Sequence, residues 1–307
     1  MTELAAADLA DAPSWCVALS GGADSLALTA AAAPLRPTTA LIVDHGLQPG
    51  SDSVAEAARL QALELGCVAA RVLSVRVGDE GGPEAAARTA RYGALAAARD
   101  GAPVLLAHTL DDQAETVLLG LGRGSGPRSI AGMRAADPPW FRPLLGQRRA
   151  DTRAACAELG LRHFEDPHNV DPRFTRVRLR TEVLPLLEEV LGGGVAEALA
   201  RTADALREDN DLLDALAAGH LAAARVDGEL HTEPLGDLPG PLRRRVIRGW
   251  LLTGGAVGLS DLQIRAVDGL ITSWRGQGGV AVGGALPNTR LFAERVGARL
   301  RLRREPV

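Results

Sequence analysis

The first half of the chain alternates short apolar runs with longer, alanine-rich stretches. Four apolar runs have the length of buried strands, at 15–20, 39–44, 67–75 and 103–108. Helical patterns lie between and after them, at 24–33, 52–66, 83–99 and 111–121. Strands that alternate with helices favour a parallel sheet covered on both faces. We therefore predict an α/β fold built on a doubly wound parallel sheet.

In the second half of the chain helical patterns dominate. They occupy 148–160, 177–190, 195–224, 241–253 and 259–273, and an ordered, arginine-rich loop at 165–180 leads into one of them. Short strand-like pieces (VAVGG, TRLFAERV and ARLRLR) follow near the C-terminus. The glycine run at 192–194 is the best candidate for a boundary. We predict a catalytic domain at 1–190 and a smaller, mainly helical domain at 191–307.

One helical segment of the second domain has a clear amphipathic pattern. In RRRVIR, at 243–248, we expect Val246 and Ile247 to face the core and the arginines to face water.

A glycine turn, SGGADS, separates the first strand from the first helix. Glycine N–H groups, serine hydroxyls and the positive end of the helix make it an anion-binding turn. The predicted phosphate-binding residues are Ser20, Gly21, Gly22, Ala23, Asp24 and Ser25. A bare carboxylate repels phosphate, so we interpret Asp24 as a Mg²⁺ ligand. The alternative is a plain strand-to-helix turn in which Asp24 caps the helix.

Two more motifs follow other strands, DHGLQPGS at 44–51 and HTLDDQAET at 108–116. Ligands of open parallel sheets bind beyond the carboxyl ends of the strands, where the strand order reverses. With the order 3-2-1-4-5, all three motifs would converge on one crevice. His45 and Gly46 would then contribute to the nucleotide site, and an ordinary turn is their alternative reading.

The motif HTLDDQAET places three carboxylates and an imidazole near the start of a helix. The candidate catalytic residues are His108, Asp111, Asp112 and Glu115. Asp111 and Glu115 are four residues apart and share a helix face. Such acids suit a metal or a cationic substrate. The alternative is a capping box between Thr109 and Asp112, with acids placed favourably in a first turn.

The composition narrows the chemistry of phosphate binding. The chain has no lysine, so all 34 basic side chains are arginine. This excludes a lysine nucleophile, a Schiff base and the lysine of a P-loop. Backbone N–H groups, hydroxyls, arginine or a metal must hold phosphate instead. The formal net charge of -4 gives no global signal for nucleic acid, so RNA would need a local basic patch.

Two groups of arginines are candidates for that patch. Arg88 and Arg91 lie one helical turn apart, although such a pair is often a solvated face. A second group surrounds Phe174 and comprises Arg173, Arg176, Arg178 and Arg180. Guanidinium groups with a stacking ring suit an RNA backbone. The alternative for the second group is a salt-bridged start of a helix.

The cysteines and the N-terminal segment indicate in which cellular compartment the protein is expected. Cys16, Cys67 and Cys156 are far apart with no CxxC pair, which argues against a disulfide framework, a zinc ribbon and a dithiol motif. The acidic N-terminal segment lacks the apolar part of a signal peptide. No stretch approaches the roughly 18 apolar residues of a membrane span. We expect a cytoplasmic protein with no membrane partner.

Taken together, the motifs resemble the tRNA(Ile)-lysidine synthetases, a family of PP-loop (N-type) ATP pyrophosphatases. SGGxDS alone is shared with NAD, GMP and argininosuccinate synthetases and with tRNA thiolases, but a thiolase needs cysteines that this chain lacks. The narrower resemblance rests on DHGL with Ser51, Arg88 with Arg91-Tyr92, HTLDDQAET, Arg123-Gly124, RPLL at 142–145, and DPHN with Arg176 and Arg178.

The resemblance extends to the family's small C-terminal domain through PLRRRVIRGWL and ARLRLRRE, in the manner of a short form. The sequence departs from the family pattern at two positions. His168 stands where the family usually has serine, and Val177 where it usually has asparagine. Both departures lie in the expected RNA-contact loop and leave the ATP site intact.

The resemblance implies that ATP, with Mg²⁺, adenylates the wobble cytidine of a tRNA(Ile) with a CAU anticodon. Free L-lysine then replaces AMP, and pyrophosphate is the other product. Asp24 would hold Mg²⁺, His108 would assist adenylation, and Asp111, Asp112 and Glu115 would capture lysine and transfer its proton. The tRNA contacts would be Arg88, Arg91, Arg173, Arg176 and Arg178.

Three points stay open from the sequence. The chain could be another PP-loop enzyme that amidates or thiolates a different RNA or a small molecule. It could also be a non-enzymatic adenine-nucleotide sensor, although that leaves the acids at 111–115 without a role. Whether two copies form a homodimer is not decided by the sequence.

Overall fold

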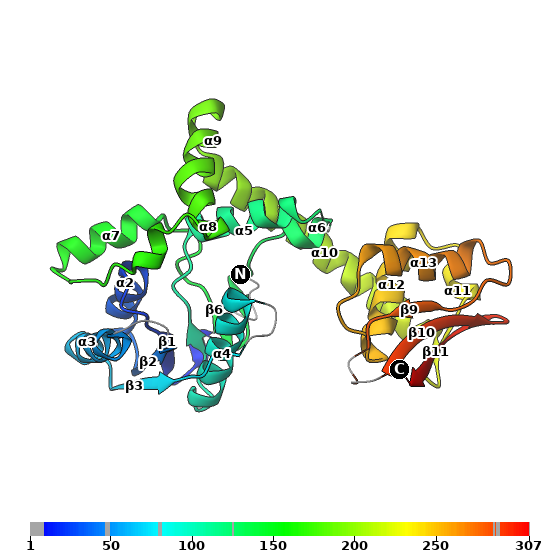
Figure 1. Cartoon of the computed structure of the whole chain (residues 1–307), viewed down its shortest axis with the longest axis horizontal. Helices are drawn as coiled ribbons and strands as arrows, with labels where there is room; N and C mark the ends of the chain where they lie inside the picture. The colour runs from blue at the N-terminus through cyan, green and yellow to red at the C-terminus, as the bar shows by residue number, and fades with distance from the viewer. Residues whose placement is uncertain are drawn as a thin grey trace. The chain divides into compact units, whose positions relative to one another are not determined.

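The computed structural model describes residues 9–46, 50–78, 82–124, 126–284, 286 and 289–306. The start of the acidic N-terminal segment and residues 47–49 of DHGLQPGS lie outside the described residues. The chain forms two compact units (Figure 1), Met1–Leu119 with Gly132–Thr202, and Gly120–Ala131 with Ala203–Val307. The division between Thr202 and Ala203 falls inside a long helix. The domain boundary expected after residue 190 stays a prediction.

The first unit contains a six-stranded sheet in the order β3-β2-β1-β4-β6-β5. Its strands are β1 (Trp15–Ala18), β2 (Thr38–Asp44), β3 (Ala69–Ser74), β4 (Val104–Leu105), β5 (Ala136–Asp137) and β6 (Trp140–Phe141). All neighbours are parallel except the β5–β6 pair at the edge. The predicted order 3-2-1-4 is confirmed, and β6 takes the fifth parallel position.

The helices of the first unit follow the predicted alternation. They are α2 (Ala23–Ala32), α3 (Ser51–Glu64), α4 (Pro83–Ala98), α5 (Leu110–Gly122), α7 (Arg149–Glu158), α8 (Thr175–Arg178) and α9 (Leu184–Leu191). A 3-10 turn, η1 (Pro167–Val170), precedes α8, and a π-helical turn, η2 (Leu179–Val183), joins α8 to α9. The arginine-rich segment is therefore a loop that leads into a helix, as expected.

Alternation along β2 shows how both faces of the sheet are covered. Ala40 and Ile42 pack with α2, α3 and α7 in one apolar cluster. Leu41, between them, points the other way and packs with residues of α4. Because side chains alternate along a strand, a continuous apolar run is what a strand buried on both faces requires. The doubly wound fold predicted from the sequence is confirmed.

The second unit combines helices with an antiparallel sheet. Its helices are α6 (Pro127–Ile130), α10 (Val195–Ala224), which begins in the first unit, α11 (Glu233–Gly236), α12 (Gly240–Thr253) and α13 (Asp261–Thr272). Its strands, in the order β7-β8-β11-β10-β9, are β7 (Arg225–Val226), β8 (Glu229–His231), β9 (Val280–Val282), β10 (Thr289–Val296) and β11 (Arg299–Pro306). The three strand-like pieces near the C-terminus are thus strands.

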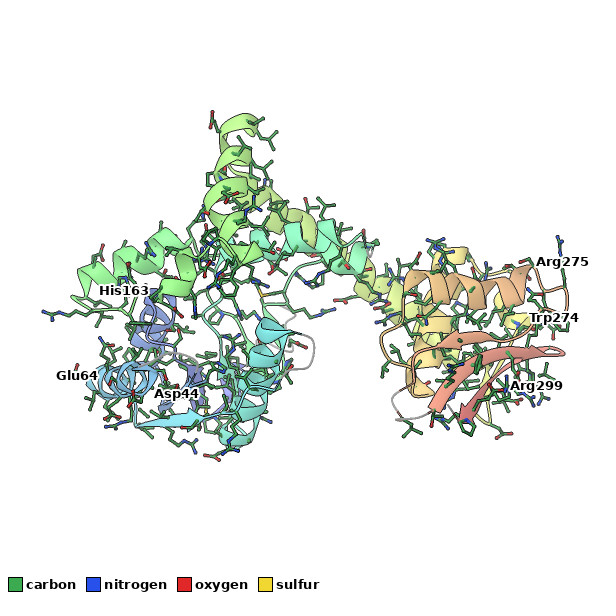
Figure 2. All side chains as sticks on the ribbon, viewed as in Figure 1. Asp44, Glu64, His163, Trp274, Arg275 and Arg299 are labelled. Atoms are coloured by element: carbon green, nitrogen blue, oxygen red, sulfur yellow. The ribbon has the colours of Figure 1, made fainter. Side chains whose placement is uncertain are left out.

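The sheet of the second unit covers one apolar core with α12 and α13. Leu300 of β11 is buried, whereas Arg299 is exposed, as are Trp274 and Arg275 after α13 (Figure 2). Helix α12 buries Val246, as expected. Among the helices in the described ranges, none combines the length and the apolar character that crossing a bilayer requires.

One expectation for α12 is wrong. Arg243 does not face water but is only 9% exposed, and its Nε donates to Asp268 Oδ1 at 2.5 Å. Its Nη1 also donates to the carbonyl oxygens of Gly236 and Leu238. A buried guanidinium needs such partners because desolvation penalises an unpaired charge. The amphipathic pattern could not reveal this pair, since Asp268 lies on another helix.

Replacing Arg243 by methionine is expected to lower the free energy of unfolding by about 3 kcal/mol, because Asp268 becomes a poorly paired buried charge. The loss is at the lower end of the usual range because Arg244 stays 3.7 Å from Asp268. Urea denaturation followed by tryptophan fluorescence measures it. The control is Arg265→Met, which removes an exposed partner of Asp261 and should change the free energy of unfolding far less. Equal losses in both variants would contradict the prediction.

Candidate functional site

The glycine turn between β1 and α2 is closed by its own hydroxyl groups. Ser25 Oγ donates to the Gly22 carbonyl oxygen at 2.9 Å and accepts from the Ser20 N–H at 3.2 Å. Gly21 has a φ of 81°, a left-handed conformation that favours glycine. The Gly21 carbonyl accepts from the Phe164 N–H at 2.8 Å, which ties the turn to the segment after α7. The local sequence therefore forms a compact turn at the carboxyl end of a parallel strand.

Asp24 lies in the first turn of α2 and contacts α7. Its Oδ1 accepts from the Thr152 hydroxyl, and its Oδ2 accepts from Arg149 Nε at 3.4 Å. The Asp24 side chain is 25% exposed. One partly exposed carboxylate beside the glycine turn suits Mg²⁺, which binds few protein carboxylates together with water and nucleotide phosphates. Asp24 is therefore a fitting Mg²⁺ ligand.

Arg149 brings the glycine turn and the acids of α5 together. Its Nη2 donates to Asp112 Oδ1 at 2.6 Å, and its Nη1 donates to Glu115 Oε1 at 3.4 Å. The same guanidinium contacts Asp24 through Nε. The motifs SGGADS and HTLDDQAET, which are far apart in the sequence, are thus brought together in the first unit through one guanidinium.

Asp112 has a structural and an electrostatic role at once. Its Oδ2 accepts from the Thr109 N–H at 2.8 Å and from the Thr109 hydroxyl at 2.9 Å, so the capping box considered from the sequence is present. Burial alone would raise the pKa of Asp112, but Arg149 and the Thr109 hydrogen bonds outweigh it and lower the pKa. Asp112 is therefore held as a carboxylate.

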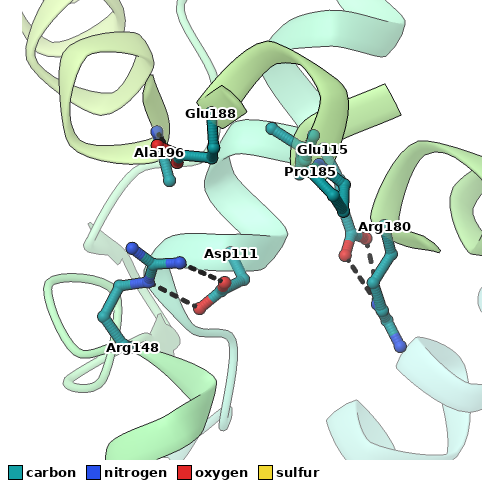
Figure 3. A pocket seen from close by; sticks show the side chains of 8 residues that line it. Asp111, Glu115, Arg148, Arg180, Pro185, Glu188 and Ala196 are labelled. Carbon is teal, nitrogen blue, oxygen red and sulfur yellow. Dashed lines mark hydrogen bonds and ion pairs between the residues drawn. The ribbon is translucent and has the colours of Figure 1, made fainter. Parts of the chain in front are cut away.

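A cavity of about 120 Å³ lies next to these acids (Figure 3). It carries both signs of charge and an apolar side, and its lining residues are Asp111, Glu115, Arg148, Arg180, Leu184, Pro185, Glu188 and Ala196. Asp111 accepts from Arg148 Nη2 at 3.1 Å, and Glu115 accepts from Arg180 Nε at 2.8 Å. Glu115 is fully buried, so these partners compensate its charge.

His108 and His45 follow β4 and β2 at the same edge of the sheet. Both have a buried Nδ1 with no hydrogen-bond partner among the described residues. Burial lowers the pKa of His108 to about 3, and the charges of Arg142 and Arg91 act in the same direction. Burial, with Arg91, also lowers the pKa of His45. The Gly46 N–H donates to Asp44 Oδ1 at 2.9 Å, so an ordinary turn is present there as well.

The His108 imidazole is expected to stay neutral between pH 5 and 8. Because its folded-state pKa is depressed, protonation favours the unfolded chain, and this contribution lowers stability as the pH falls from about 6.5 toward 3. Two-dimensional ¹H–¹⁵N spectra of the imidazole nitrogens measure the charge state, and the variant His108→Asn assigns the signal. An imidazolium signal for His108 at pH 6 would contradict the prediction.

The predicted RNA-contact arginines fall into two groups. Arg88 lies 4.7 Å from the Tyr92 ring centroid and Arg91 lies 5.6 Å from it. Burial lowers the pKa of Arg91, and Arg88 and Arg176 add to this effect, so Arg176 lies within electrostatic range of α4. Three of the predicted residues therefore lie near one another.

The other arginines of the loop contact acids. Arg173 pairs with Asp171 at 2.6 Å, and Arg178 pairs with Glu182 at 2.9 Å. These ion pairs are what the salt-bridged alternative expected, and both arginine side chains are exposed. Arg180, which the sequence grouped with them, instead contacts Glu115.

Sequence reasoning missed the basic side of this site. Arg148 and Arg149 stand shortly after RPLL, and no local pattern distinguished them from a solvated helix start. Thr152 and Glu188 were also missed, although Glu188 lines the cavity and accepts from the N–H of Val195 at 3.0 Å. Only their contacts with other segments and their place beside the cavity reveal these residues.

Comparison with known proteins assigns the class and then the family. A PP-loop domain model matches residues 2–187, and a TilS substrate binding domain model matches 230–297. Together with the fold and the glycine turn, this defines a PP-loop ATP pyrophosphatase. The tRNA(Ile)-lysidine synthase of Mycolicibacterium paratuberculosis is 73% identical over 95% of this chain and 91% of its own length. The chain belongs to the tRNA(Ile)-lysidine synthase family.

A second relative agrees with this family assignment, and a solved structure agrees with the fold. The tRNA(Ile)-lysidine synthase of Nocardia farcinica is 67% identical over 96% of this chain and 93% of its own length. Among solved structures, a U34-tRNA thiolase from Methanococcus maripaludis is similar with a TM-score of 0.53, over 65% of this chain and 74% of that one. At 18% identity, this similarity supports the fold alone.

Proposed function

We propose that this chain joins free L-lysine to the wobble cytidine of a tRNA(Ile) with a CAU anticodon, converting ATP to AMP and pyrophosphate. The chain is an ATP-dependent ligase that forms lysidine, in keeping with its relatives. The observation that supports the site assignment best is the Arg149 guanidinium, which contacts Asp24 beside the glycine turn and Asp112 and Glu115 on α5.

In the first step, the oxygen on the 2-carbon of cytosine attacks the α-phosphorus of ATP. A P–O bond to the base forms, and the bond to the bridging oxygen breaks, so pyrophosphate leaves. The N–H groups of Gly21 and Gly22 would hold the leaving phosphates. Asp24 would hold Mg²⁺, which neutralises phosphate charge. This step converts a poor leaving group on the base into AMP.

In the second step, the ε-amine of lysine attacks the same carbon. A C–N bond forms, and the C–O bond breaks, so AMP leaves with that oxygen. Free amine is scarce near neutrality because the lysine pKa is about 10.4. A carboxylate must therefore hold the ammonium, and a base must accept its proton. We assign these tasks to Asp111, Asp112 and Glu115.

The cavity beside α5 supports binding of an amino acid. Leu184 and Pro185 offer an apolar side for a methylene chain, while Asp111 and Glu115 suit an ammonium group. Arg148 and Arg180 suit a carboxylate because a guanidinium binds it with two hydrogen bonds. In the described state, these arginines pair with the acids, so lysine must exchange ion pairs as it binds.

The anticodon base must leave its stack to reach the crevice. Arg88, Arg91 and Arg176 would contact the RNA backbone near it, and the exposed Arg173 and Arg178 would exchange their acids for phosphates. The second unit, which carries the TilS substrate binding domain match, would bind another part of the tRNA. With a tRNA as substrate, we place the reaction in the cytoplasm.

Release of pyrophosphate from the purified full chain tests this function. ATP, lysine and tRNA are supplied together and then omitted one at a time. Release that requires both ATP and tRNA, with lysidine found in the RNA only when lysine is present, supports the proposal. ATP binding without pyrophosphate release under every combination would support a nucleotide sensor instead.

A further inference from the structure

We propose that Arg149 is a positioning residue that couples the nucleotide half of the site to its acid-rich half. The inference rests on the proposed function only in taking the acids of α5 as the lysine half. It concerns a residue that neither the glycine turn nor the motif HTLDDQAET contains. Three contacts with acids from two different helices carry it.

Each of the three nitrogen atoms of the Arg149 guanidinium serves a different carboxylate. Nε lies 3.4 Å from Asp24, Nη2 lies 2.6 Å from Asp112, and Nη1 lies 3.4 Å from Glu115. The Arg149 side chain is only 16% exposed, so water screens these contacts weakly. A planar guanidinium can hold three acids in fixed directions, which a single ammonium group cannot.

Helix α7, which begins at Arg149, is held to α5 and α2 by hydrogen bonds of its own. The Arg149 N–H donates to Asp111 Oδ2 at 2.7 Å. One turn later, the Thr152 hydroxyl donates to Asp24, and Cys156 Sγ lies 3.3 Å from the Ala23 carbonyl oxygen. Helix α7 is thus attached to both α5 and α2. The Arg149 side chain therefore starts from a defined position between the two halves.

Sharing one cation has an energetic consequence. Asp24 and Glu115 sit on different helices, and Arg149 contacts both. If Glu115 loses its charge, Arg149 interacts more strongly with the acids that remain, Asp24 among them. Asp24 is then less available to a Mg²⁺–ATP complex. A change at Glu115 is therefore felt at the nucleotide site, although Glu115 belongs to the lysine half.

The test measures the dissociation constant of ATP in the presence of Mg²⁺, with the full chain and without tRNA or lysine. Glu115→Gln is expected to raise this constant about three- to tenfold, as for residues coupled through a shared partner. In an Arg149→Met background, the same substitution is expected to change it less than about twofold. Loss of folding alone would not produce this pattern. An unchanged effect of Glu115→Gln in the Arg149→Met background would overturn the proposal.

Arg180 provides the matched control. It contacts Glu115 at 2.8 Å and Asp112 at 3.7 Å, and the described contacts of Asp24 do not include it. In an Arg180→Met background, Glu115→Gln should keep its full effect on ATP binding. If the effect disappears there as well, the coupling does not pass specifically through Arg149, and the proposal is wrong.

A replacement variant covers a failure to fold, and the binding measurement separates this proposal from the proposed function. If Arg149→Met does not fold, Arg149→Lys replaces it. A compact ammonium lacks the planar fork that reaches three acids in fixed directions, so the coupling should fall below about twofold. The binding measurement is also independent of lysine transfer. Coupling without lysidine formation would overturn the proposed function alone, and lysidine formation without coupling would overturn the role of Arg149 alone.

Discussion

Replacing Asp24 by alanine is expected to lower the rate of pyrophosphate release about 100- to 1,000-fold. Asp24 lies in the first turn of the helix that follows the glycine turn, and no other carboxylate belongs to that turn. Its loss removes the proposed Mg²⁺ ligand, so the charge that develops on the leaving pyrophosphate is no longer compensated. The measurement is pyrophosphate release with saturating ATP, lysine and tRNA.

The control for this experiment is Asp209→Ala, which removes an exposed acid of α10. It should leave the rate within about twofold of the unmodified chain, as expected of a surface substitution. Circular dichroism verifies that both variants are folded. A folded Asp24→Ala protein that releases pyrophosphate at the normal rate would show that the glycine turn is not the phosphate site.

Replacing Glu115 by glutamine is expected to separate the two steps of the reaction. Adenylation should proceed at saturating ATP, while transfer to lysine should fall about 100- to 10,000-fold, as when an acid–base group is lost. Glutamine keeps the size and a hydrogen-bond acceptor for Arg180, but it removes the charge that would attract the ammonium group. Adenylated tRNA should therefore accumulate, and mass spectrometry of the RNA measures it.

Glu64→Gln is the matched control, since Glu64 ends α3 and is exposed. It should form lysidine at the normal rate. Raising the lysine concentration should restore part of the rate of Glu115→Gln if the carboxylate acts mainly in binding, whereas no recovery indicates the proton-transfer role. Normal lysidine formation by Glu115→Gln would remove Glu115 from the site in either role.

Local sequence patterns predicted most of the helices and strands of the first unit. The four apolar runs and the helices between them required only residues close in the sequence. The strand order 3-2-1-4-5 was an assumption, the one with which the three motifs would converge. The glycine turn was recognisable for the same reason, since Gly21 and Gly22 are adjacent and precede a helix. The meeting of Asp24 with Asp112 and Glu115 was predicted because both segments follow neighbouring strands.

The basic partners of those acids could not be predicted in this way. Arg148 and Arg149 begin a helix whose pattern is amphipathic and unremarkable, and Arg180 stands in a run of arginines that suggested RNA. The buried pair of Arg243 and Asp268 joins two helices through residues that are 25 positions apart in the sequence. In each case the function of an arginine depends on which distant carboxylate it meets.

The sequence by itself determined the layered α/β fold, the glycine turn after β1 and the acids on α5, because spacing and residue type suffice for features made within one segment. Only the tertiary structure decided that Arg149 joins these features and that Glu188, Leu184 and Pro185 complete a cavity beside them. The physical reason is that ion pairs act over a few ångströms in space, and separation along the chain carries no information about that distance.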